Sequence, residues 1–159
     1  MIGEFGVYLP EGRPVIGSLP SQLEIGDVTT QGLPFYSGIL SYDVPIHIES
    51  NENDRQFLRA PSFAAACLKV KTSESSSSMI AWEPYETEIT QMLQDTNSVQ
   101  VDAVFTRRNT FGPLHLQPKY QAAYGPDHFI TRGEHFTNDY QFIPSGLLAP
   151  LEVVTRVEE

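Results

Sequence analysis

The sequence contains little cysteine or tryptophan, with one residue of each among its 159 positions. The lone Cys67 excludes an intrachain disulfide, and its alanine-rich surroundings predict a buried and unreactive thiol. Zinc binding is disfavoured too, because cysteine is scarce and no two of the four histidines have the H-x-x-x-H spacing of a zinc site. We therefore expect neither a disulfide framework nor a zinc centre.

Long apolar runs are also missing. No stretch approaches the ~20 apolar residues of a membrane-spanning helix, so we expect no membrane partner. The first residues have neither the basic segment nor the apolar run of a signal peptide. Two alternatives stay open for the full-length protein: a cytoplasmic location, or secretion directed by a segment outside this sequence.

Basic residues are scarce relative to acidic ones. Ten lysines and arginines stand against twenty aspartates and glutamates, which gives a formal net charge of −10. Such a surface repels phosphates, so the charge argues against nucleic acid as a partner. It favours a neutral partner, or simply solubility.

The composition and the periodicity of the chain predict an all-β fold. A length of 159 residues suits a single domain, 1–159, and twelve prolines and eleven glycines suit a chain with many turns. Seven to nine short strands separated by polar turns, with almost no helix, predict a β-sandwich.

Three segments alternate with the period of a half-buried strand, at 39–48, 64–72 and 98–106. Pro45 cannot donate a ladder hydrogen bond, so the first of them should be an edge strand or be bulged there. The apolar side of the alternation should face the core, which predicts inward positions for Tyr42, Val44, Ile46, Leu68, Val70, Val99, Val101 and Phe105.

Other segments are predicted from shorter signals. The four-residue spacing of Tyr85, Ile89 and Leu93 predicts one or two helical turns. Residues 4–9, 56–60, 78–83, 139–143 and 151–157 are expected to be strands. After Arg107 the periodicity fails for about 30 residues, and loops of such length are usually functional or closely packed.

Two motifs carry a resemblance to a known family. The first runs I-A-W-x-P-Y-x-x-x-I-T-x-x-L from Ile80, then an alternating strand, then R-N-x-F-G-P-L-H ending at His115. The second is G-L-P-F-Y-S-G at 32–38, followed by a strand that contains Tyr42. Together they resemble the sugar-binding jelly-roll domains of galactose-binding-domain-like fold that are attached to glycoside hydrolases of the family two type.

The resemblance implies a non-catalytic accessory domain of a larger glycoside hydrolase. Its partners would be carbohydrate and the catalytic domain of the same polypeptide, and residues 1–25 would contain an inter-domain strand or linker. Members of the family often carry a structural calcium ion. An oxygen-rich loop offers candidate ligands, although a plain solvated loop is the alternative; these are Asn51, Glu52, Asn53 and Asp54. No other cofactor is expected.

Candidate carbohydrate contacts lie mainly in the irregular region 107–136, where side chains can converge without strand alternation. Aromatic rings offer platforms for sugar C–H faces, and arginine and histidine offer donors to hydroxyls. The candidates are Arg107, Arg108, His115, Tyr120 and Tyr124. Trp82 is a further candidate platform, although its place at the end of an inner strand favours a core position. Arg108-Asn109 and Gly112-Pro113 could instead only fix the loop.

No arrangement of residues indicates catalysis by this chain alone. The sequence lacks a nucleophile-elbow motif. Glu83, Glu86 and Glu88 alternate along a turn, and the pairs 127–128 and 134–135 would point to opposite faces if extended. Two alternatives to the carbohydrate-binding interpretation stay open: a protein-interaction or scaffolding module without a sugar site, and, less favoured, an independent hydrolase.

Overall fold

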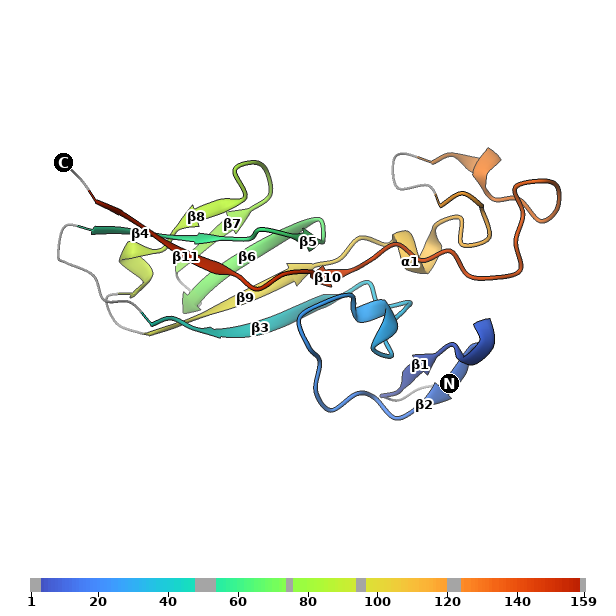
Figure 1. The fold of residues 1–159 in the computed structure, drawn as a ribbon, viewed down its shortest axis with the longest axis horizontal. Coiled ribbons are helices and arrows are strands. Elements are labelled where there is room, and N and C mark those ends of the chain that lie inside the picture. The colour runs from blue at the N-terminus through green and yellow to red at the C-terminus, as the bar shows by residue number, and fades with distance from the viewer. Residues whose placement is uncertain (1–3, 48–53, 74–75, 94–96, 120–123, 158–159) are drawn as a thin grey trace. The chain divides into compact units, whose positions relative to one another are not determined.

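The computed structural model describes residues 4–47, 54–73, 76–93, 97–119 and 124–157. The chain forms two compact units (Figure 1). We call Gly38–Phe105 with Gly146–Glu159 the sheet unit, and Met1–Ser37 with Thr106–Ser145 the loop unit. Each unit is built from two separate stretches of the chain. The single domain over 1–159 stays a prediction.

A four-stranded antiparallel sheet is the larger sheet of the sheet unit, with strand order β3-β9-β6-β7. Its strands lie side by side in Figure 1. Strand β3 is at the edge and ends at Pro45, which confirms the edge prediction. The strands are β3 (Ile39–Pro45), β6 (Cys67–Ser73), β7 (Ser76–Ile80) and β9 (Ser98–Val104).

A second antiparallel sheet has the order β11-β4-β8. Its strands are β4 (Asp54–Arg59), β8 (Glu86–Glu88) and β11 (Glu152–Val157), which confirms the predicted last strand. A short pair, β5 (Phe63–Ala64) with β10 (Gly146–Leu147), completes the unit. A hydrogen bond between the hydroxyls of Ser78 and Thr87 joins β7 to β8. The all-β prediction is therefore confirmed.

The core of the sheet unit follows the predicted alternation. Six of the eight predicted inward positions are buried, namely Ile46, Leu68, Val70, Val99, Val101 and Phe105. Tyr42 and Val44 are half-buried, because the edge strand β3 has a neighbour on one side only. Burial raises the pKa of Tyr42, and the N–H of Leu147 donates a hydrogen bond to its hydroxyl at 3.4 Å. Leu58 and Ile89 contribute fully buried side chains outside the four-stranded sheet.

Two predictions fail where long-range hydrogen bonds decide the backbone conformation. Residues 85–89 are not helical: Glu86–Glu88 pairs with β4, and only Thr90–Leu93 forms a turn of 3₁₀-helix, η3. Residues 139–143 do not form a strand, since the N–H of Gln141 donates to the Leu114 carbonyl. Local spacing cannot show either partner.

The strand predicted at 64–72 is also interrupted. Strand β5 ends at Ala64 and β6 begins at Cys67. Between them, the N–H of Ala66 donates to the carbonyl of Val104 at 2.8 Å. Cys67 is half-buried, so the prediction of a buried thiol is wrong; it lies at the first position of the strand, where packing is incomplete.

The loop unit has little regular structure, as the loss of periodicity after Arg107 predicts. Its elements are the hairpin β1 (Gly6–Tyr8) and β2 (Val15–Gly17), the single-turn helix α1 (Arg108–Phe111), and the 3₁₀ turns η1 (Pro10–Gly12), η2 (Val28–Thr30) and η4 (Pro126–His128). No helix in the described part of the chain is long and apolar enough to cross a membrane.

Side-chain hydrogen bonds and aromatic packing connect the two stretches of the loop unit. Oδ1 of Asp27 accepts from the N–H groups of Thr29 and Ser145 at 3.0 and 3.1 Å. Within the second stretch, the Asn109 side-chain amide donates to the Ile143 carbonyl at 2.8 Å and accepts from the Ile143 N–H at 3.0 Å. Phe35 also packs edge-on against the rings of Tyr140 and Phe142. Asn109 therefore fixes the long loop, as one of the alternatives from the sequence proposed.

The buried position of Val101 gives a direct test of the core. Val101 is 0% exposed, so Val101→Ala should lower the free energy of unfolding by about 1–3 kcal/mol through lost burial and a cavity. Val153→Ala is the matched control, because Val153 is also in a strand but is 37% exposed. Urea unfolding measures both variants. Equal losses would contradict the assigned core.

Candidate functional site

The predicted arginines lie at the start of the long loop, around α1. Arg108 is only 4% exposed, and burial lowers the pKa of its guanidinium. Its Nη2 donates to the Pro113 carbonyl at 3.4 Å, and the guanidinium lies over the Tyr124 ring at 5.7 Å. Arg107 is exposed, while its carbonyl accepts from the N–H groups of Thr110 and Phe111. The structure thus brings Arg108 and Tyr124 together within a packed part of the loop unit.

His115 belongs to a second aromatic group of the same unit. Its ring lies 5.0 Å from the Tyr140 ring and 5.8 Å from the Phe136 ring, measured between centroids. Its Nδ1 is 3.0 Å from the Thr137 carbonyl oxygen. Tyr120 lies outside the described residues. A carbohydrate-binding role for these side chains stays a prediction.

The loop unit also contains an open cavity of about 400 Å³. Asp27, Thr30, Lys119 and Tyr140 line it together with apolar side chains. One oxygen of Asp27 is already hydrogen-bonded to two backbone N–H groups, as described above. None of these four residues was predicted from the sequence to contact a ligand.

Trp82 is at the surface of the sheet unit and is 72% exposed. The prediction that it favours a core position is therefore wrong. Strand β7 ends at Ile80, three residues before the end of the strand predicted at 78–83, and the chain then turns through Pro84 into β8. Because the indole is exposed in this turn, the alternative role of Trp82 as an aromatic platform for a sugar stays a prediction.

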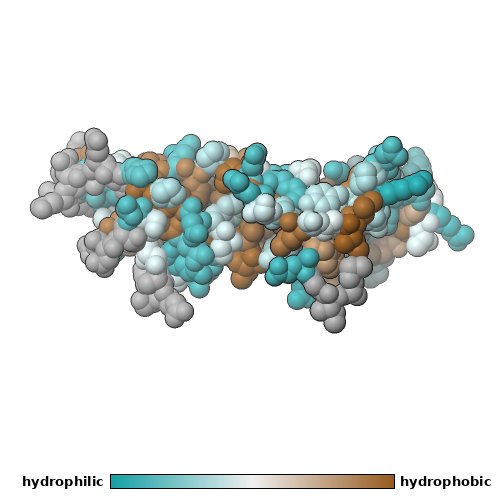
Figure 2. All heavy atoms as spheres, turned by 90° about the horizontal axis from the view of Figure 1, so that it is seen from below, coloured by the Kyte–Doolittle hydropathy of each residue, from teal (hydrophilic) through white to brown (hydrophobic). Residues whose placement is uncertain are grey.

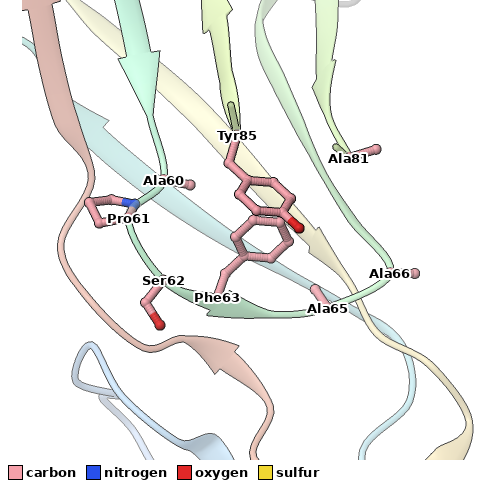
Figure 3. A pocket seen from close by; sticks show the side chains of 8 residues that line it. All are labelled: Ala60, Pro61, Ser62, Phe63, Ala65, Ala66, Ala81 and Tyr85. Carbon is pink, nitrogen blue, oxygen red and sulfur yellow. The ribbon is translucent and has the colours of Figure 1, made fainter. Parts of the chain in front are cut away.

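The turn after Trp82 borders a cavity of about 310 Å³ within the sheet unit (Figure 3). Two aromatic rings line it, Tyr85 and Phe63, packed edge-to-face with centroids 5.4 Å apart. Figure 3 shows these rings arriving from different segments of the chain and meeting over the loop that carries Phe63. The remaining lining residues are small or compact: Ala60, Pro61, Ser62, Ala65, Ala66 and Ala81.

The backbone of Tyr85 has an unusual conformation, with φ at +52°. The left-handed region costs a residue other than glycine about 1–2 kcal/mol, and a bulky side chain there is uncommon. Two backbone hydrogen bonds hold it: its N–H donates to the Trp82 carbonyl, and its carbonyl accepts from the Ala60 N–H, both at 2.9 Å. These hydrogen bonds hold the backbone of Tyr85 in this strained conformation.

Tyr85 and Phe63 were not predicted as site residues. Tyr85 was assigned to a helical turn, and Phe63 lies 22 positions away in the sequence. The one signal available was the W-x-P-Y motif, in which Tyr85 follows a proline that interrupts the strand. The side-chain contact between the two rings becomes visible only in the folded chain.

The acidic side chains near this turn are paired with arginines. Arg59 Nη2 lies 3.0 Å from Oε2 of Glu86, and Arg156 binds the other oxygen of the same carboxylate. Arg55 binds Glu88. Burial acts to raise the pKa of Glu86, but the hydrogen bonds from Arg59 and Arg156 outweigh it, so the pKa is lowered. Such a carboxylate stays ionised and connects strands.

A hydrogen bond from Arg55 is likewise the main reason that the pKa of Glu88 is lowered. In η4, Oδ1 of Asp127 lies 3.3 Å from Nδ1 of His128, and that nitrogen also accepts from the N–H of Gly125. Metal-binding groups of three or more His, Cys, Asp or Glu side chains are absent from the described residues. Of the predicted calcium loop, Asn51, Glu52 and Asn53 lie outside the described residues, and Asp54 opens β4.

Comparison with solved structures finds a fold similar to part of a rhamnosidase from Novosphingobium sp. PP1Y. The match has a TM-score of 0.59 and 16% sequence identity, and it covers 96% of this chain and 14% of the rhamnosidase chain. The chain thus corresponds to about one seventh of that protein's length. No family model matches this sequence, and no curated protein does. At this identity, the likeness shows the fold.

The ion pairs of Glu86 predict a specific dependence of stability on pH. Its folded-state pKa lies below the ordinary value of 4.5. The pairs therefore contribute stability that is present above pH 4.5 and is lost as the pH falls through the folded-state pKa. Glu86→Gln should lower the urea midpoint at pH 7, and its difference from the wild type should shrink on acidification.

Glu83→Gln serves as the control, since Glu83 is exposed and takes part in none of these ion pairs. The urea midpoint of Glu83→Gln should equal that of the wild type at every pH. A deficit in Glu86→Gln that stays constant down to pH 3 would rule out the electrostatic explanation.

Proposed function

We propose that this chain is a non-catalytic accessory domain of a larger glycoside hydrolase, and that it binds carbohydrate in that setting. The observation that carries the proposal is the unequal coverage of the structural match. Nearly the whole chain, 96%, corresponds to only 14% of a chain named as a rhamnosidase. A segment of about 159 residues is as long as a typical single domain, so the match corresponds to one domain of a much longer enzyme.

The fold type belongs to the same proposal: a jelly-roll sandwich of galactose-binding-domain-like type. The two larger sheets of the sheet unit, both antiparallel, support it. The two family-like motifs support it as well, because both lie at structurally fixed positions. Asn109 of the second half of the longer motif anchors the loop to Ile143, and Pro34 of G-L-P-F-Y-S-G is fully buried.

The arrangement of acidic residues supports a non-catalytic role. A glycosidase needs two carboxyl groups that flank one bond, and one of them must be protonated to act as an acid. Glu86 and Glu88 are instead held ionised by arginines on neighbouring strands. The chemistry would then come from another domain of the same polypeptide.

Carbohydrate binding is supported by the exposed aromatic surface of the sheet unit. Trp82 is exposed, and Tyr85 lines the adjacent cavity. A net charge of −10 does not oppose a neutral sugar. Sugar affinity of a single module is expected to be weak, because a small polar ligand leaves little net free energy after desolvation and ordering.

A scaffolding module without a sugar site is the second candidate, and exposed apolar residues of the loop unit favour it. Ile16 is 51% exposed and Phe111 is 66% exposed. Figure 2 shows hydrophobic residues lying among hydrophilic ones on the face in view. Apolar residues of this kind suit contact with another protein domain. An independent hydrolase has less support, for the reasons given for Glu86 and Glu88.

Trp82 provides a direct test of carbohydrate binding, because it is the only tryptophan of the chain. Titration with neutral oligosaccharides, rhamnose-containing ones included, should change its fluorescence in a saturable way. An exposed indole responds to a sugar ring that covers it. If no saccharide alters the emission or releases heat in calorimetry, the scaffolding module becomes the better account.

The non-catalytic part of the proposal has its own test. Incubation of the 159-residue chain with aryl glycosides should release no aryl product above the buffer rate. The reason is that the carboxylates of Glu86 and Glu88 are paired with arginines. Turnover that disappears in Glu134→Gln or Asp127→Asn would show that this chain is a hydrolase after all.

A further inference from the structure

We propose that the cavity lined by Tyr85 and Phe63 is a binding site for one uncharged pyranose ring; this rests on the proposed carbohydrate-binding function. We call it the Tyr85 cavity. Four observations carry the proposal: the volume, the absence of charged lining residues, the paired aromatic rings and the fixed backbone of Tyr85.

The volume selects a small ligand. Ligand pockets in proteins usually measure about 300–1,000 Å³, so a cavity of about 310 Å³ is near the lower limit. One sugar ring suits this size, whereas several rings of an oligosaccharide would extend beyond it. The site would therefore take a terminal residue of a glycan, with the remainder outside.

The lining selects a neutral ligand. Alanine, proline, serine, phenylalanine and tyrosine make up the eight lining residues, and none of these side chains is charged at neutral pH. A uronic acid would place its carboxylate in the cavity without a cation to pair with it, at a cost in desolvation. The neighbouring arginines, Arg59 and Arg156, already bind Glu86.

The two rings supply an apolar platform with a polar group at its end. A pyranose has a C–H face that packs on aromatic rings, and its hydroxyls need hydrogen-bond partners. Tyr85 offers both, a ring face and a phenolic hydroxyl, and Phe63 supports the ring edge-to-face. Alanines at positions 60, 65, 66 and 81 keep the opposite walls free of bulky side chains.

The backbone of Tyr85 is fixed before any ligand arrives. A bulky residue at φ +52° is retained only where its surroundings enforce it, and such residues concentrate at ligand sites. The hydrogen bonds to Trp82 and from Ala60 hold both backbone polar groups of Tyr85. Little ordering is then needed on binding, which favours affinity for a small ligand.

The test compares variants of the 159-residue chain by calorimetry, with methyl α-L-rhamnopyranoside, methyl β-D-galactopyranoside and sodium D-glucuronate as probes. Tyr85→Gly removes the ring and suits a positive φ. Glu11→Gly is the matched control, because Glu11 also has φ +52° but belongs to the loop unit. Ala66→Leu narrows the cavity at an exposed position, where added bulk leaves the core intact.

We expect at least one neutral glycoside to bind the wild type, and glucuronate to bind at least tenfold more weakly. Tyr85→Gly and Ala66→Leu should each lower the affinity for the neutral glycoside at least tenfold. Glu11→Gly should bind it with the affinity of the wild type. Unfolding curves confirm that each variant is folded.

Three results would overturn the proposal, and they differ in what they imply for the broader function. If a neutral glycoside binds all variants equally, the Tyr85 cavity is not the site, but the carbohydrate-binding function stands. If no probe binds the wild type while longer oligosaccharides do, the single-ring site is wrong. Absence of binding by every saccharide removes both the site and the carbohydrate-binding function.

Discussion

Strand β9 is hydrogen-bonded on both sides, and the rest of the sheet unit depends on that double pairing. Val101 pairs with Tyr42 of β3 on one side and with Val70 of β6 on the other, and its side chain is buried in the core. The opposite face carries Asp102, which is also buried and is bonded by Ser41 at 2.7 Å and Lys71 at 2.8 Å. Burial acts to raise the pKa of Asp102, yet these partners lower it, so the charge is kept. The Val104 carbonyl of β9 also accepts a hydrogen bond from the N–H of Ala66. Strand β9 therefore positions Ala66, which lines the Tyr85 cavity.

Much of this sheet could be predicted from the sequence, because alternation is a local property of a strand. The inward faces of β3 and β9, the edge position of Pro45 and the last strand all follow from the pattern. The failures at 85–89 and 139–143 share one physical cause. Residues 85–89 and 139–143 adopt conformations that distant partners decide, such as Arg59 for β8 and Asn109 for Ile143. Sequence spacing carries no information about those partners.

The candidate site was harder to predict for a related reason. A long irregular loop marks either binding or packing, and the sequence does not separate them. Arg108 shows the difficulty, since its guanidinium is buried over Tyr124. Trp82 shows the reverse case, because the chain leaves the sheet before it and exposes the indole. Tyr85 and Phe63 meet only after β4, β5 and β8 are in place. The site therefore depends on contacts between residues that are distant in the sequence, whereas the strands of the sheet are largely predictable from local alternation.

The most direct measurement is a ¹⁵N–¹H correlation spectrum of the chain, titrated with a neutral glycoside that binds it. We predict that the amide signals of Phe63, Ala65, Ala66 and Tyr85 shift together and saturate at one dissociation constant. The amide of Ile16, on the exposed hairpin of the loop unit, should not move. If only amides of the loop unit shift and those of the Tyr85 cavity are unchanged at saturation, the Tyr85 cavity is not the binding site.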